Sequence, residues 1–253
     1  MTPELTLADW YTRFQQQAGW TAEIRRHLFK QSGLTPGSHV LEVGCGTGAV
    51  MGAIAEEFCF NLTGVDINRP SLRFAQSDNP KFQFTQADGH RLPFADNSFD
   101  AVYCHYLLLW VTDPAQVLAE MRRLTRPGGV VIALAEPDYE SRIDYPPPLD
   151  ELGRLQTESL KLQGADVEMG SKLTDLFQQT SLLNVYTKTL EENFSQEPNL
   201  KESMEWDVLR SDLNGRISEA ELLEFELYEQ DARANGERVM IIPTFYAIGW
   251  VGS

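Results

Sequence analysis

Hydrophobic residues in the first half of the chain follow two alternating patterns. Short apolar runs, typical of buried strands, are separated by segments with helical spacing. This alternation predicts a parallel sheet with helices on both faces. The expected strands cover 40–43, 61–67, 82–86, 99–106 and 130–135, and the expected helices cover 7–29 with a break at Gly19, 49–58, 70–78 and 114–124. Right-handed crossovers bring the carboxyl ends of such strands to one edge, where ligands bind.

The second half is less regular. The three prolines at 146–148 indicate a linker or a helix stop, and the pattern then predicts a helix over 149–162 and a strand over 185–190. Ser218 and Glu221 form a capping box that begins a helix through about 233, and 238–251 reads as a final apolar strand. We therefore expect an N-terminal helical cap (1–35), a ligand-binding core (36–145), and a helical cover with final strands that complete the core sheet (146–253).

The charge distribution argues against a nucleic-acid partner. The chain has a formal net charge of -16, and residues 191–231 contain 13 acidic and 3 basic residues. Cations that meet phosphates supply most of the affinity for nucleic acids, so this chain would repel a duplex. We interpret the acidic stretch as solvated helix faces.

The remaining composition points to a cytoplasmic protein. No apolar run is long enough to span a membrane, and the N-terminal residues lack the features of a secretory signal. Cys45, Cys59 and Cys104 are scattered and form no metal-binding spacing. They predict reduced thiols and no metal site.

The strongest local motif lies where the first strand meets the first helix, and it reads E-V-G-C-G-T-G over 42–48. Glycines let the backbone approach a ligand, and the start of the following helix offers unpaired N–H groups. Glu42 precedes them in a strand predicted to be buried on both faces, where an ionised carboxylate requires a cationic partner. Gly44, Gly46 and Ala49 also satisfy the dinucleotide fingerprint, with Asp66 about 20 residues on. An NAD(P)- or FAD-binding oxidoreductase is therefore the main alternative.

Two further acids follow strands at the same edge. Asp66 ends the second strand, where it would accept hydrogen bonds from ribose hydroxyls, and Asp88 follows the third, where it would reach an adenine amino group. S-adenosylmethionine carries an ammonium and a sulfonium group, which would supply the cation for Glu42. The three acids together favour this cofactor over a dinucleotide, although Asp also commonly caps helices and occupies turns.

Four segments in order resemble the class I S-adenosylmethionine-dependent methyltransferases: 40–48, 64–66, 87–100 and 124–129. The P-F-x-D-x-S-F-D wording of 93–100 is similar to the small-molecule branch that includes ubiquinone and menaquinone methyltransferases. The resemblance implies an α/β fold with a Rossmann-like, doubly wound, seven-stranded and mostly parallel sheet whose last strand is antiparallel, plus N-terminal helices and a helical insertion. It also implies in-line methyl transfer to a small-molecule acceptor. The N/D-P-P-Y/F motif of enzymes that methylate nucleic-acid amino groups is absent at 104–107.

The predicted site residues fall into two groups. Methyl transfer mainly requires positioning, and it needs a base only if the acceptor loses a proton. His105 is the first candidate for that base because it titrates near neutrality, and Glu136 and Tyr139 are further candidates. Arg142 would bind an anionic acceptor. The expected cofactor-binding residues are Arg13, Glu42, Gly44, Cys45, Gly46, Gly48, Asp66, Ile67, Asp88, Gly89 and His105.

Structural alternatives stay open for several of these side chains. His105 and Arg13 are also explained by core packing, and Glu136 and Tyr139 by an ordinary polar turn. A non-catalytic S-adenosylmethionine-binding protein remains a third reading. The sequence predicts neither the acceptor nor the oligomeric state.

Overall fold

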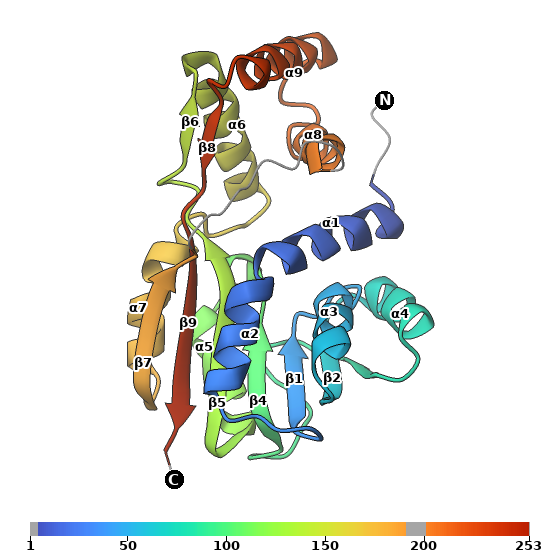
Figure 1. Cartoon of the computed structure of the whole chain (residues 1–253), viewed down its shortest axis with the longest axis vertical. Coiled ribbons are helices and arrows are strands. Elements are labelled where there is room, and N and C mark those ends of the chain that lie inside the picture. Colours follow the sequence, from blue (N-terminus) through green and yellow to red (C-terminus); the bar gives the residue numbers. More distant parts are fainter. Residues whose placement is uncertain (1–4, 191–200, 253) are drawn as a thin grey trace.

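The computed structural model describes residues 5–190 and 201–252, and of residues 201–203 it describes the backbone alone. In this part of the chain, seven strands form one sheet in the order β3-β2-β1-β4-β5-β9-β7 (Figure 1). Neighbouring strands from β3 to β5 are parallel, whereas β9 is antiparallel to both β5 and β7. The predicted mostly parallel sheet with an antiparallel last strand is therefore confirmed. The strands are β1 (His39–Val43), β2 (Asn61–Asp66), β3 (Gln83–Gln86), β4 (Phe99–Cys104), β5 (Thr125–Pro137), β7 (Leu182–Thr189) and β9 (Thr244–Val251).

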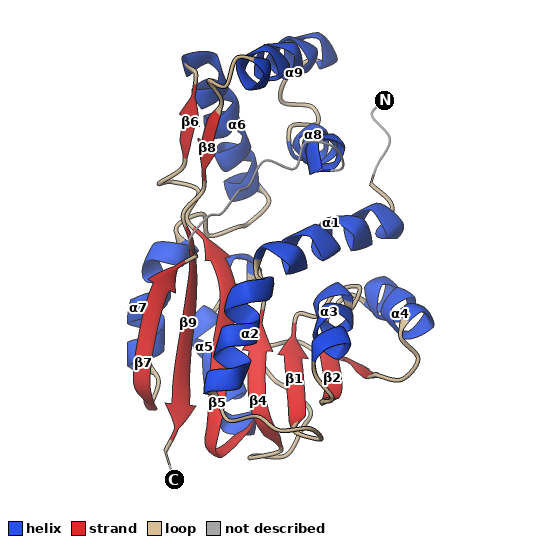
Figure 2. Cartoon of the chain, viewed as in Figure 1, coloured by secondary structure: helices blue, strands red, loops and turns tan. Residues whose placement is uncertain are grey.

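Helices cover both faces of this sheet (Figure 2). One face packs against α2 (Ala22–Gln31), α3 (Ala49–Glu57) and α4 (Arg69–Asp78), and the other packs against α5 (Pro114–Leu124) and α7 (Met169–Gln179). Side chains of a strand alternate between the two cores, as the pleat requires. In β4, Ala101 and Tyr103 enter the first core and Val102 and Cys104 the second. The sheet is thus buried on both sides, and its edge is left for a ligand.

A second layer, which we call the cover, lies over the carboxyl edge of the parallel strands (Figure 1). It consists of α6 (Pro147–Leu162), α8 (Lys201–Asp212), α9 (Glu219–Ala234) and a two-stranded sheet of β6 (Ile143–Tyr145) and β8 (Val239–Ile241). The cover has its own apolar core, formed by Leu149, Leu152, Trp206, Leu209, Leu213, Leu222 and Ala232. Helix α1 (Leu7–Trp20) crosses between the cover and the sheet (Figure 1). The predicted division of the chain into three units stays a prediction.

Three predictions for the second half require correction, and three elements there were not predicted. The expected single strand over 238–251 is two strands, because β8 pairs with β6 in the cover and β9 joins the core sheet. Pro147 and Pro148 begin α6 instead of stopping a helix, since the fixed φ of proline suits a first turn. Helices α7 and α8 and strand β6 were not expected. The acidic stretch is only partly solvated, because Glu229 is buried, and its residues 191–200 lie outside the described part of the chain.

Neither a membrane-spanning helix nor a metal-binding cluster is found among the described residues. None of the helices there is both long and apolar enough to cross a membrane. No group of three or more His, Cys, Asp or Glu side chains in the same residues is placed to hold a metal ion. The three cysteines are free, and Cys45 and Cys104 are buried.

Candidate functional site

A cavity of about 280 Å³ lies between the carboxyl edge of the sheet, helix α1 and the cover. Its floor is the glycine loop, its roof is α1, and its far wall comes from α6 and α8. A larger groove of about 700 Å³ between α1 and α3 contains none of the predicted site residues, so we place the site in the smaller cavity. The lining residues are Trp10, Arg13, Phe14, Gln17, Glu42, Gly44, Cys45, Gly46, Ala49, Val50, Asp66, His105, Tyr106, Leu107, Leu109, Trp110, Tyr139, Gln156, Leu160, Val208 and Asp212.

The glycine loop has backbone conformations that other residues rarely adopt. Gly44, Gly46 and Gly48 have φ angles of 75°, 49° and 76°. A Cβ on Gly44 would lie 2.6 Å from a terminal methyl carbon of Leu107, so a larger residue would have to displace that side chain and adopt a positive φ. Gly48 begins α3, and a Cβ there would lie 3.2 Å from Cβ of Ala75. Gly44 and Gly46 therefore line the cavity, whereas Gly48 permits close packing of α3 against α4.

Glu42 supplies a buried acid directly beneath this loop. Its side chain is 2% exposed, and Oε2 accepts a hydrogen bond of 2.8 Å from the Tyr103 hydroxyl. Burial raises the pKa of Glu42 to about 8, and Asp66 adds to this effect, while the Tyr103 hydrogen bond and Arg25 oppose it. The acid is therefore mostly protonated at neutral pH unless a cation enters the cavity.

Arg13 faces the cavity from helix α1. Its NH1 atom is buried and has no hydrogen-bond partner among the described residues, and the guanidinium lies 4.8 Å from the centre of the Trp20 ring. A buried, unpaired guanidinium nitrogen is costly and requires an anionic or carbonyl oxygen. The cavity thus combines an acid that needs a cation with a cation that needs an anion. This donor set fits the amino acid part of S-adenosylmethionine, which has an ammonium group and a carboxylate.

Asp66 lies at the end of β2 and lines the same cavity. Its Oδ2 accepts a hydrogen bond of 2.7 Å from the Gly46 amide, and its Oδ1 accepts one of 2.7 Å from the Asn68 amide. These bonds hold the carboxylate against the glycine loop. The remaining lone pairs of the carboxylate are available to hydroxyl donors.

Three other predicted residues lie at the same sheet edge but do not line the cavity. Asp88 is bound through Oδ1 to the backbone amide of His90 at 2.9 Å and to its ring Nδ1 at 2.6 Å. The Ile67 side chain is 66% exposed. Gly89 packs against Val43, whose Cγ1 would be 3.4 Å from an added Cβ. The roles of these residues in cofactor binding, including the contact of Asp88 with an adenine amino group, stay predictions.

His105 lines the cavity but is tied to helix packing. It is 8% exposed, and its Nε2 lies 3.1 Å from the Thr21 hydroxyl oxygen. Burial, assisted by Arg25, lowers the pKa of His105 to about 3. The ring is therefore neutral at physiological pH and only weakly basic. Its predicted role as a base is not favoured by this geometry.

The candidates at the end of β5 have different surroundings. Glu136 is fully buried away from the cavity, where it accepts hydrogen bonds of 2.9–3.1 Å from the amides of Leu107, Leu108 and Leu109. It thus holds the loop and the short helix η1 (Leu108–Trp110) that line the cavity. Tyr139 lines the cavity itself. Arg142 does not, because its guanidinium is bound to Asp144 and Gln156.

Sequence reasoning missed several lining residues. Tyr106 follows β4 with a φ of 51°, which is unusual for a non-glycine residue and typical of functional sites. Trp110 is 45% exposed at the cavity rim. Gln156 and Asp212 come from cover helices, where no local motif distinguishes them from surface residues. Only Tyr106 carried a usable signal, since it stands at the carboxyl end of the predicted strand over 99–106, at the ligand edge.

Comparison with known proteins gives a consistent result. A family described as "Methyltransferase domain" matches residues 41–133. The demethylmenaquinone methyltransferase of Renibacterium salmoninarum is 37% identical over 48% of this chain and 52% of that enzyme, so the chain spans about half the length of this relative. The ubiquinone/menaquinone biosynthesis C-methyltransferase of Desulfotalea psychrophila is 31% identical over 65% of this chain and 73% of that enzyme.

The fold also has solved counterparts. The phosphoethanolamine N-methyltransferase 2 of Haemonchus contortus, in complex with S-adenosyl-L-methionine, superposes with a TM-score of 0.57 at 15% identity. The superposition covers 87% of this chain and 50% of that chain. At this identity the likeness concerns the fold alone.

Proposed function

Because the chain belongs to the class I S-adenosylmethionine-dependent methyltransferases, in the branch of the ubiquinone and menaquinone C-methyltransferases, we propose that it transfers a methyl group from S-adenosylmethionine to a small-molecule acceptor. The family membership leaves the dinucleotide-dependent oxidoreductase without support. A non-catalytic S-adenosylmethionine-binding protein would retain the same cofactor residues, so an acceptor assay has to distinguish it.

One observation carries the proposal: a buried acid, a guanidinium with a buried unpaired nitrogen and a loop of glycines with positive φ angles meet in a single cavity. Glu42 would hold the ammonium group, and Arg13 would hold the carboxylate. Asp66 would accept hydrogen bonds from the ribose hydroxyls. When bound, the cofactor supplies a methyl group that is already activated by its sulfonium.

The chain's own residues then have mainly positional tasks. The cavity is closed by α1 on one side and by the cover on the other, which limits the entry of water. Glu136 fixes the loop at 107–109 through three amide hydrogen bonds, and Tyr106 and Trp110 add aromatic surface. Such preorganisation is the main contribution a protein makes to a displacement of this kind. We assign no proton transfer to His105 or Glu136.

We further propose a cytoplasmic protein that acts on a small molecule and not on a nucleic acid. The proposal draws on the three free cysteines and on the acidic composition.

Calorimetric titration with S-adenosylmethionine and, separately, with NADH tests the cofactor assignment. We expect S-adenosylmethionine alone to bind, and Asp66→Ala to weaken it by about 1–3 kcal/mol because ribose hydroxyls lose their acceptor. Asp78→Ala is a control, since Asp78 instead binds the Tyr11 hydroxyl outside this cavity. Binding of NADH without S-adenosylmethionine would refute the proposal.

A further inference from the structure

The cavity wall opposite the glycine loop contains a carboxylate that the cofactor assignment does not use. Asp212 is the last residue of α8 and lines the cavity together with Gln156 and Tyr139. These three side chains come from α8, α6 and the loop after β5, whereas Glu42 and Asp66 come from β1 and β2 of the core sheet. A carboxylate at this end is therefore available to the second ligand.

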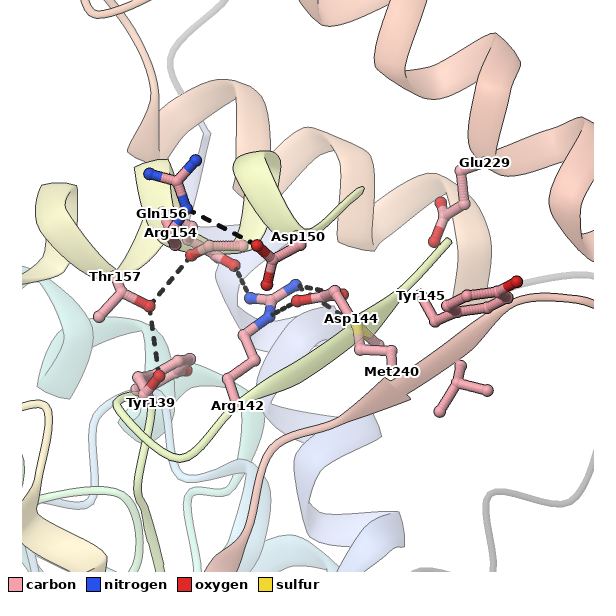
Figure 3. Close-up of polar contacts among 12 residues, drawn as sticks. Tyr139, Arg142, Asp144, Tyr145, Asp150, Arg154, Gln156, Thr157, Glu229 and Met240 are labelled. Carbon is pink, nitrogen blue, oxygen red and sulfur yellow. Dashed lines mark hydrogen bonds and ion pairs between the residues drawn. The ribbon is translucent and has the colours of Figure 1, made fainter. Parts of the chain in front are cut away.

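Asp212 is held in a fixed orientation. Its Oδ2 accepts a hydrogen bond of 2.9 Å from the Gln156 amide nitrogen, and its Oδ1 accepts one of 3.3 Å from the Gln163 amide nitrogen. The amide oxygen of Gln156 in turn accepts a hydrogen bond from Arg142 (Figure 3). Because Arg142 occupies the oxygen, the nitrogen of Gln156 has to point toward Asp212.

Arg142 is itself anchored by buried charges. Figure 3 shows its guanidinium between Asp144 and Gln156. The side chains of Arg142 and Asp144 are 5% and 2% exposed, and Asp144 also binds Arg238 at 2.7 Å. Arg238 also forms an ion pair of 2.7 Å with the buried Glu229. A connected series of charged groups thus runs through the cover and ends, through Gln156, at the cavity.

The charges at this end of the cavity favour a neutral partner for Asp212. Burial raises the pKa of Asp212, and the hydrogen bonds from Gln156 and Gln163 and the positive charge of Arg13 oppose this effect. Neutral amide groups of Gln156 and Gln163 already donate to this carboxylate, so a neutral hydroxyl donor matches this end of the cavity. Trp10, Phe14, Tyr106, Trp110 and Tyr139 give the cavity aromatic walls that suit a flat ring.

Building on the proposed function, we propose that Asp212 accepts a hydrogen bond from a hydroxyl group of the methyl acceptor. Arg142 and Gln156 are positioning residues that orient its carboxylate for this contact. Asp212 thereby selects acceptors that present a hydroxyl group over equally shaped ones that do not. When the bound ligand lacks a hydroxyl group, the Asp212 carboxylate is left without that hydrogen-bond donor. The unpaired carboxylate weakens the binding of such a ligand.

The test uses the full chain saturated with S-adenosylhomocysteine and three probes of similar shape: 4-ethylphenol, 4-ethylanisole and 4-ethylbenzylamine. Calorimetry measures the affinity of each. We expect 4-ethylphenol to bind at millimolar concentration and about tenfold or more tightly than 4-ethylanisole, as a hydrogen bond to a charged group provides. In Asp212→Ala and Gln156→Leu, the ratio of the affinities for 4-ethylphenol and 4-ethylanisole should fall toward one. The affinity for S-adenosylhomocysteine should stay unchanged.

Asp207→Ala is the matched control for Asp212→Ala, because both residues lie on α8 and Asp207 does not line the cavity. Thermal unfolding and cofactor affinity show whether each variant is folded. Equal binding of phenol and anisole, unchanged preference in Asp212→Ala, stronger binding of the amine, or no phenol binding to the saturated protein would each overturn the inference. Failure of the wild type to bind S-adenosylhomocysteine would instead refute the proposed function.

Discussion

The buried acid at Glu42 makes cofactor binding depend on pH in a way that can be calculated. Because its pKa is about 8, the free protein at pH 7 holds this proton in most molecules. The ammonium group of the cofactor needs the ionised form. Binding should therefore release a proton, and the dissociation constant should fall as the pH rises toward 8.

The magnitude follows from the pKa. The ionised fraction of Glu42 is about one in a hundred at pH 6 and about one in eleven at pH 7, so affinity should increase about tenfold, or ~1.4 kcal/mol, over this interval. At pH 7 about 0.9 proton should leave per site. Calorimetry in two buffers with different ionisation enthalpies measures this number directly.

Other charged groups near Glu42 do not produce the same signal. Tyr103 and Arg25 face it from β4 and α2, and burial raises the pKa of Tyr103 well above its usual value. Neither therefore titrates between pH 6 and 7. Glu42→Gln should bind the cofactor more weakly at pH 8 and with no proton release. Affinity of the wild type that is constant from pH 6 to 7, with no released proton, would refute the reasoning.

The same acid affects folding with a defined sign. Its pKa rises from 4.5 in the unfolded chain to about 8 in the folded protein, so the folded state binds the proton more tightly. Stability of the free protein should decrease as the pH rises above 4.5, with the full cost present above 8. Thermal unfolding of Glu42→Gln should show a weaker decrease over this range. A parallel decrease in both proteins would mean that other groups cause it.

Three further variants test the architecture. Gly44→Ala should lower the free energy of unfolding by about 1–3 kcal/mol, measured in urea, since its Cβ would strike Leu107, whereas Gly37→Ala has open space and should cost less. Glu136→Gln should cost about 1–3 kcal/mol and speed hydrogen exchange at the amides of 107–109, and unchanged exchange there would contradict its holding role. Arg142→Met should lower the free energy of unfolding by about 3 kcal/mol, because the buried Asp144 loses Arg142 and keeps only Arg238 as an ion-pair partner. Arg154→Met, whose side chain is 63% exposed, should cost less than ~0.5 kcal/mol, so equal costs would argue against the buried network.

The sheet and the glycine loop could be predicted because their signals are local. Asp113 caps α5 through a bond to the Gln116 amide, and Ser218 caps α9 with Glu221, as their spacing indicated. Strand period and glycine content likewise depend on neighbouring residues. Glu42 and Asp66 were predicted to face one ligand, and the parallel topology brings both to one cavity.

The rest of the site depends on contacts between distant segments. Gln156 and Asp212 are 56 residues apart, and their meeting requires the packing of α6 against α8. Glu136 ends a strand at the ligand edge, yet its carboxylate binds backbone amides because the loop at 107–109 passes beneath it. The chain over 239–251 is mostly apolar, and only the pairing of β8 with β6 divides it between two sheets. Each of these contacts depends on tertiary packing, so none of them could be predicted from the local sequence pattern.

The cysteine within the glycine loop gains importance from its neighbours. Cys45 lines the cavity, and burial together with the charges of Glu42 and Asp66 raises the pKa of its thiol well above the usual value. The thiolate is the form that attacks electrophilic carbon, and a sulfonium methyl group is such an electrophile. Burial and the neighbouring acids therefore keep the Cys45 thiol protonated, and the protonated thiol is a poor nucleophile. If the protein transfers methyl groups as proposed, this setting would protect Cys45 from being methylated by the bound cofactor.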